Sequence, residues 1–233
     1  MSRTAVIAGV GPGLGASLAR RFVAEGCRVG LFARSTDFLD DLATDLGEDA
    51  LAVPTDVTDP AQVEAGFEAV RDAFGPVDVL VNHASAASWK GLEDLSPAEF
   101  ERAWRVSAYG PLLCSKEAAA DMLSGDGGTI LFTGATSAVR GRDGALGFSA
   151  AKFAARGMAE SMARELGPAG IHVAHVVLDG QIDSPRAREA TPERDPSSFL
   201  DPDAIAESYW HLVTQDRSSW TLELDLRPSV EEF

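Results

Sequence analysis

The chain has 233 residues, of which 45% are apolar and 24% charged, a composition typical of a soluble globular protein with a sizeable core. Its formal charge of −16 argues against nucleic acid or an anionic membrane surface as a partner, and no apolar run is long enough to cross a bilayer. A strand-like pattern starts within the first few residues, so we expect no signal peptide and a cytoplasmic location. Cys27 and Cys114 lie far apart without metal-like spacing, which predicts free thiols and no metal site.

Short apolar runs alternate with amphipathic segments along the chain. Strands are predicted over Thr4–Val10, Arg28–Ala33, Ala50–Val53, Val77–Val81, Thr129–Thr133 and His172–Leu178, with a further strand pattern over Trp220–Leu226. Helical periodicity covers Leu14–Glu25, Thr36–Leu46, Pro60–Phe74, Pro97–Met122 and Ser149–Leu166. The alternation predicts an α/β fold: a single domain over residues 1–233, built as a doubly wound parallel sheet with helices on both faces.

One segment interrupts this pattern. Ser184–Asp203 is rich in proline and charged residues and has no apolar stripe longer than a helical turn. Such a segment is either an ordinary loop or a mobile lid over a site, and its place in this architecture favours the lid.

A glycine-rich turn joins the first predicted strand to the first predicted helix. Gly9, Gly13 and Gly15 lie in this turn, and the helix begins at Leu14. Glycines let the backbone approach a phosphate closely, and the N-terminus of a helix attracts the anion. The turn therefore predicts a nucleotide site.

The motifs along the chain, taken in order, resemble those of the short-chain dehydrogenase/reductase family. They are Gly9-x-x-x-Gly13-x-Gly15, Asp56 after the third strand, Asn82-His83-Ala84-Ser85 after the fourth, and Asp179-Gly180-Gln-Ile182-Asp-Ser184 after the sixth. Three residues depart from the family's motifs: His83 and Ser85 occupy family Asn and Gly positions, and Asp179 occupies a family proline position. The resemblance spans nearly the whole chain. It implies a Rossmann fold, a nicotinamide cofactor, a small-molecule substrate and assembly into a homodimer or homotetramer through the long helices.

The same resemblance implies a set of cofactor-binding residues. They are Gly9, Gly13, Leu14, Gly15, Arg34, Ser35, Asp56, Val57, Asn82, Ala84, Lys152, Gly180, Ile182 and Ser184. At the end of the second strand, a carboxylate would bind the ribose 2′-hydroxyl of NAD, whereas an arginine accommodates the 2′-phosphate of NADP. Arg34, followed by Ser35 and with no acidic residue nearby, therefore favours NADP(H) over NAD(H).

The expected catalytic residues are largely replaced. Phe148 and Lys152 have the spacing of the family's Tyr-x-x-x-Lys pair, one helical turn apart. The resemblance places the family's Tyr at Phe148, its Ser at Ala135 and its Asn at Ser107, so that Lys152 alone is retained. Phenylalanine cannot exchange a proton and alanine cannot hydrogen-bond a carbonyl group. Because a positioned acid is worth about 10²–10⁴ in rate, we expect the usual mechanism to be severely weakened.

Several polar residues are candidate substitutes. Ser137 would face the same way as Ala135 if the strand continued that far. His83, Asp143 and Asp179 are candidate acids or bases, and Asp179 is the most interesting because it replaces a proline close to the expected nicotinamide. A structural histidine, a solvated turn or a cap would explain them equally simply.

Three functional hypotheses follow. The first is an atypical NADP(H)-dependent oxidoreductase acting on a small carbonyl, alcohol or activated alkene, with a proton donor other than tyrosine. The second is a catalytically inactive NADP-binding sensor or assembly protein. The third is a non-redox elimination or isomerisation on the same fold. We favour the first, because the nucleotide site and Lys152 are both intact.

Overall fold

The computed structural model describes residues 2–230 and is built around one seven-stranded sheet with the order β3-β2-β1-β4-β5-β6-β9. All six pairings between neighbouring strands are parallel. The strands are β1 Thr4–Ala8, β2 Arg28–Ala33, β3 Ala50–Pro54, β4 Val79–Asn82, β5 Gly128–Thr133, β6 Ile171–Leu178 and β9 Glu223–Leu226. The predicted doubly wound parallel α/β fold is confirmed. The order reverses between β1 and β4, where folds of this kind place their ligands.

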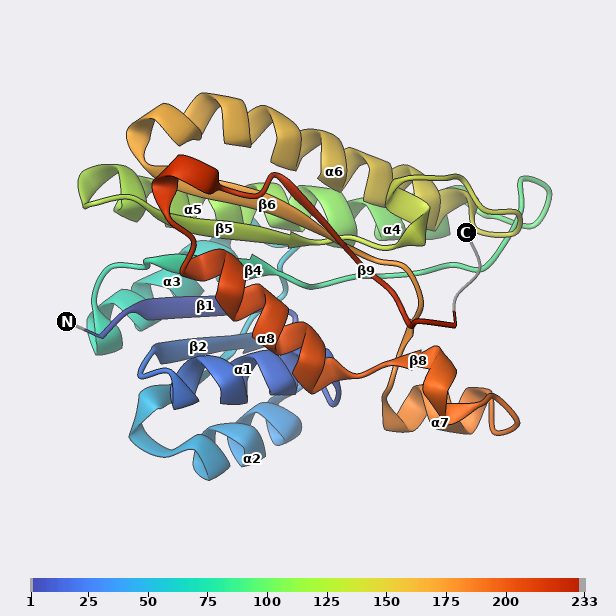
Figure 1. Ribbon diagram of the computed structural model, residues 1–233, viewed down its shortest axis with the longest axis horizontal. Helices are drawn as coiled ribbons and strands as arrows, with labels where there is room; N and C mark the ends of the chain where they lie inside the picture. Colours follow the sequence, from blue (N-terminus) through green and yellow to red (C-terminus); the bar gives the residue numbers. More distant parts are fainter. Residues whose placement is uncertain (1, 231–233) are drawn as a thin grey trace.

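Helices cover both faces of the sheet. The core on one face includes side chains from α1 (Leu14–Ala24), α2 (Thr36–Leu46) and α8 (Pro202–Val213), and α8 lies beside α1 (Figure 1). The core on the other face includes side chains from α3 (Pro60–Phe74), α5 (Gly110–Ser124) and α6 (Leu146–Leu166). Strands covered on both faces must be apolar throughout, which explains their near-continuous apolar runs. In the described part of the chain, no helix is both long and apolar enough to span a membrane.

The predicted long helix over Pro97–Met122 is interrupted. It consists of α4 (Pro97–Trp104), a π-helical turn over Arg105–Tyr109, and α5 from Gly110 onward. Pro111 at the start of α5 has no N–H to donate to the preceding turn, which accounts for the wider winding there. A Cβ on Gly110 would also lie 2.9 Å from the carbonyl oxygen of Val57. The close approach to Val57 therefore requires a glycine at the point where the helix widens.

The C-terminal strand is shorter than the pattern over Trp220–Leu226 predicts. Only Glu223–Leu226 forms β9, which pairs with the outer side of β6. The indole of Trp220 instead stacks on the ring of His172 with a centroid separation of 4.9 Å. Thr221 donates its N–H to the side chain of Gln215. Trp220 and Thr221 therefore make other contacts, and the pairing of β9 with β6 begins at Glu223.

The polar segment Ser184–Asp203 folds into a small lobe. It contains α7 (Pro185–Ala190) and β8 (Phe199–Leu200), and β8 pairs with β7 (Gln181–Ile182). The Ser184 side chain caps α7 by accepting the N–H of Ala187. Figure 1 shows this lobe projecting from the carboxyl end of the sheet, beyond α8.

Candidate active site

The glycine turn brings bare backbone to the point where the strand order reverses. Gly9 and Gly13 have φ of 110° and 121°, values that side chains disfavour. A Cβ on Gly9 would lie 2.4 Å from the backbone nitrogen of Ala84, and one on Gly15 would lie 2.9 Å from the Cα of Val10. Beside Gly11, in contrast, no heavy atom lies within 4 Å of a Cβ position. The turn is thus packed on one side and open on the other, which fits the close approach of a dinucleotide phosphate.

A cavity of about 910 Å³ begins at this turn and follows the ends of the neighbouring strands. Of the predicted cofactor-binding residues, it is lined by Gly9, Arg34, Ser35, Asp56, Val57 and Ala84. Burial raises the pKa of the Asp56 carboxyl. Hydrogen bonds from the Thr58 N–H and hydroxyl, together with the charges of Arg34 and Arg105, outweigh that effect and hold this pKa below its usual value. The carboxylate is therefore ionised and fixed in place.

The remaining predicted cofactor-binding residues near the turn have other surroundings. Leu14 is the first residue of α1, and its side chain belongs to the core. A Cβ on Gly13 would lie 3.3 Å from the Cβ of Ser184, so the lobe touches the turn. Asn82 donates its side-chain N–H to the hydroxyl of Ser115, while its carbonyl oxygen is buried without a hydrogen-bond partner within residues 2–230.

A second cavity, of about 710 Å³, adjoins the first at His83 and Ser85. Ala135, Phe148 and Lys152 line it together, as do Gly180 and Ile182. The ammonium of Lys152 is buried, donates a 2.7 Å hydrogen bond to the carbonyl oxygen of Thr133, and lies 5.7 Å from the centre of the Phe148 ring. Burial lowers the pKa of Lys152 to about 8. The structure thus brings together the cofactor turn and three of the four positions aligned with the family's catalytic residues.

Ser107, the fourth of these positions, lies in the π-helical turn. Its hydroxyl accepts the N–H of Ala86 at 3.1 Å and lies 3.5 Å from the hydroxyl of Ser85. It lines neither of these cavities. Ser107 therefore anchors the loop after β4 to the helix.

The condition under which Ser137 would face the same way as Ala135, a strand that continues to Ser137, is not met. β5 ends at Thr133, and Ser137 lies in a single 3₁₀ turn over Thr136–Ala138. Ser137 nevertheless lines the second cavity. Its side chain is fully buried, and its hydroxyl has no hydrogen-bond partner among the described residues. A buried hydroxyl without a partner is costly, which makes Ser137 a candidate for a contact with a bound molecule.

The two aspartate candidates are not brought to Lys152. The carboxylate of Asp179 is buried, accepts the hydroxyl of Thr136 at 2.5 Å, and pairs with Arg140 and Arg227 at 3.4 Å each. It joins the segment after β5 to the end of the sheet and does not line the second cavity. Asp143 is exposed and lies outside that cavity too.

His83 is half-buried, lines both cavities and belongs to a chain of polar groups that continues into the core. Its Nδ1 is 3.2 Å from the Thr133 hydroxyl, which is 2.8 Å from the hydroxyl of Tyr209. Burial, with the nearby charge of Lys152, lowers the pKa of His83 to about 4. The imidazole is therefore neutral at neutral pH. Neither Thr133 nor Tyr209 was predicted as a site residue. The sequence does carry a signal for Thr133, because a polar residue at the carboxyl end of an apolar parallel strand lies where such folds bind their ligands.

An aromatic and cationic wall completes the second cavity. The rings of Trp89 and Phe148 lie 5.3 Å apart, and the guanidinium of Arg142 lies 5.9 Å from the Trp89 ring. Arg140 and Arg194 also line this cavity. These arginines are visible in the sequence, but whether their side chains reach this cavity depends on the conformation of loops that the sequence does not specify. No cluster of three or more metal-ligating side chains was found in residues 2–230.

Comparisons with known proteins agree with this geometry. The family model for short chain dehydrogenase matches residues 3–195. The chain is 35% identical over 177 residues to the 3-alpha-(or 20-beta)-hydroxysteroid dehydrogenase of Mycobacterium tuberculosis, an alignment that covers 74% of this chain and 66%, just under two thirds, of that protein.

Two solved structures match over nearly their full length. The 3-ketoacyl-(acyl-carrier-protein) reductase from Brucella melitensis, complexed with NADH, has a TM-score of 0.86 at 29% identity and covers 97% of both chains. The alcohol dehydrogenase from Thermococcus sibiricus, complexed with 5-hydroxy-NADP, has a TM-score of 0.89 at 26% identity and covers 100% of this chain and 99% of that one. The protein belongs to the short-chain dehydrogenase family.

Proposed function

We propose that the protein is an NADP(H)-dependent oxidoreductase that interconverts a small carbonyl compound, or an activated alkene, with its reduced form. One observation carries this proposal: the buried ammonium of Lys152 and the unpartnered hydroxyl of Ser137 line one cavity, and that cavity adjoins the glycine turn. A site kept only for nucleotide binding would not require a second cavity lined by a proton donor and a free hydroxyl.

The adenosine end of the cofactor would lie in the first cavity, with Asp56 at the adenine and Arg34 and Ser35 at the 2′-phosphate. Arg34 is exposed on the cavity wall, where its charge acts on Asp56, and makes no direct ion pair within the described residues. A free guanidinium matches a phosphate better than a ribose hydroxyl. When bound, the cofactor supplies or accepts a hydride.

Lys152 takes the place of the missing tyrosine as the proton donor. Its pKa of about 8 leaves it mostly protonated at neutral pH while keeping the proton easy to release. Ser137 would hold the substrate oxygen, in place of the serine absent at Ala135. The ring of Phe148 excludes water beside the ammonium, which explains why an apolar residue suits this position.

Nucleotide binding tests the first half of this proposal. We expect calorimetry to show NADPH binding about tenfold or more tighter than NADH, because a charged hydrogen bond to the 2′-phosphate is worth that much. Arg34→Ala should remove the preference. Arg164→Ala is the matched control, since Arg164 is 69% exposed at the far end of α6. If the wild-type protein binds neither nucleotide, the oxidoreductase proposal is wrong.

Turnover tests the second half. A panel of aldehydes, ketones and enones with NADPH should give measurable oxidation of NADPH, and Phe148→Tyr should raise the rate by supplying the family's phenol. Saturable NADPH binding without turnover of any compound would favour the binding-protein hypothesis. Conversion of substrate without net loss of NADPH would favour elimination or isomerisation.

A further inference from the structure

The second cavity differs in charge from the rest of the molecule. The chain has 36 acidic and 20 basic residues. The cavity is nevertheless lined by Arg140, Arg142, Lys152 and Arg194, and no aspartate or glutamate lines it in the described part of the chain. The first cavity, in contrast, includes Asp56 and Glu99 as well as arginines. A cavity this cationic in so acidic a protein calls for a functional explanation.

Two of the three arginines have no carboxylate partner within residues 2–230. Arg140 pairs with Asp179, so its charge is balanced. Arg142 lies against the face of Trp89, and Arg194 donates to neutral oxygens of Gln181 and Ser198. Both guanidinium groups therefore keep an uncompensated positive charge at the cavity.

These arginines come from separate parts of the chain and line the same cavity. Arg142 lies in the loop before α6, and Arg194 lies in the lobe between α7 and β8. The cavity is also lined by the wall formed by Trp89 and Phe148, whose rings are inclined at 56°. Aromatic rings favour a flat, apolar body, and guanidinium groups favour an anionic oxygen pair.

We infer that the substrate is an anionic carbonyl compound: a flat or apolar body that carries a carboxylate, held by Arg142 and Arg194. The inference rests on the proposed function and adds the substrate class to it. In the reduction, hydride from NADPH adds to the carbonyl carbon, the carbon–oxygen π pair moves to oxygen, and Lys152 protonates that oxygen. The products are a hydroxy acid and NADP⁺, with the lysine reprotonated by water.

A pair of probes that differ only in charge tests the inference. 4-Formylbenzoate and its methyl ester have the same reacting aldehyde and a nearly identical body. With NADPH, we expect kcat/KM for the acid to exceed that for the ester by about tenfold, the effect of one charged hydrogen-bond pair. This advantage should shrink at high salt, because the cavity is open to solvent at Arg142.

Variants locate the effect. Arg142→Gln should lower kcat/KM for the acid far more than for the ester, and Arg164→Gln should alter neither. If the wild-type protein reduces acid and ester equally well, the inference is wrong although the proposed function stands.

If neither probe is reduced, binding of the products separates the two failures. Calorimetry of the NADP⁺ complex would then compare 4-(hydroxymethyl)benzoate with its methyl ester. A preference for the acid that Arg142→Gln removes would support the anion site and place the failure in the proposed reaction. Absence of any preference would overturn the inference.

Discussion

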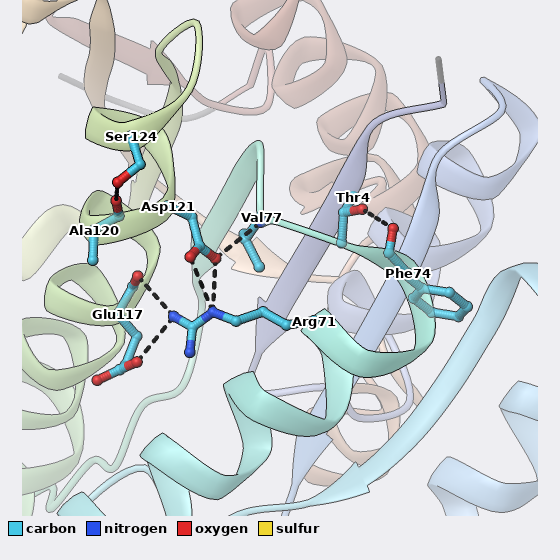
Figure 2. Close-up of polar contacts among 8 residues, drawn as sticks. All are labelled: Thr4, Arg71, Phe74, Val77, Glu117, Ala120, Asp121 and Ser124. Atoms are coloured by element: carbon cyan, nitrogen blue, oxygen red, sulfur yellow. Dashed lines mark hydrogen bonds and ion pairs between the residues drawn. The ribbon is translucent and has the colours of Figure 1, made fainter.

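At the end of the sheet where the strands begin, Arg71 of α3 faces two carboxylates of α5. Its Nε donates to both oxygens of Asp121 at 3.0 Å, its Nη2 donates to Glu117 at 3.0 Å, and Asp121 also accepts the N–H of Val77 (Figure 2). At the end where the strands finish, the ammonium of Lys152 donates to a backbone carbonyl and lines a cavity. Both are cations beside the same sheet, yet among the described residues Arg71 has carboxylate partners and Lys152 has none.

This difference in partners distinguishes groups that stabilise the fold from groups that are available to bind a ligand. Arg71 ties two helices and the start of β4 together, and its donors meet acceptors within the chain. Lys152, Ser137 and Asn82 all lie at the carboxyl end with incomplete partners in the described residues. Buried polar groups are normally satisfied, so a cluster of incomplete ones marks the place where another molecule completes them. Changes at the two ends should therefore affect different measurements.

Lys152→Met gives the largest expected effect. Loss of the proposed proton donor should lower kcat for NADPH-dependent reduction by about 10²–10⁴, measured at saturating NADPH. Because the folded state penalises the charged ammonium below about pH 8, the free energy of unfolding should not fall. A variant that unfolds more easily but turns over at the wild-type rate would place Lys152 with Arg71, as a structural cation.

The pH profile sharpens this prediction. Reduction requires the protonated lysine, so its kcat/KM should be level below about pH 8 and fall about tenfold for each unit above it. Oxidation requires the free amine and should rise toward about pH 8 before levelling. A profile for reduction that stays flat from about pH 6 to pH 9.5 would exclude Lys152 as the donor.

Arg71→Met should show the opposite pattern. It leaves Asp121 and Glu117 without their shared partner, and the three side chains are only 15–30% exposed. We expect the free energy of unfolding to fall by about 2 kcal/mol, less than for a fully buried pair because water reaches the site. Chemical denaturation measures the loss. At denaturant concentrations below the unfolding transition, kcat and KM should match the wild type. A loss of activity without a loss of stability would contradict the assignment of Arg71 as a purely structural cation.

The parts of this molecule that the sequence predicted are those fixed by local spacing. The glycine turn, and the placing of Phe148 and Lys152 one helical turn apart, depend on a few consecutive residues. The direction of Ser137 depends on the chain leaving β5 at Thr133, where no local signal distinguishes a 3₁₀ turn from a longer strand. The charge of the second cavity could not be predicted either, because Arg142 and Arg194 are far apart in sequence and reach the same cavity only through the fold of the loop and the lobe.

Ser137→Ala gives the smallest expected effect and tests the comparison most narrowly. The hydroxyl has no partner to lose among the described residues, so removing it should leave the free energy of unfolding unchanged or slightly higher. In the proposed reaction it gains a partner only when substrate binds, so kcat/KM should fall by about fivefold to tenfold, the value of one hydrogen bond. Ser115→Ala is the matched control, because Ser115 is equally buried but already accepts a hydrogen bond from Asn82. That variant should lose stability and keep the activity of its folded fraction. Equal behaviour of the two serine variants would mean that a missing partner does not distinguish ligand-binding groups from structural ones in this fold.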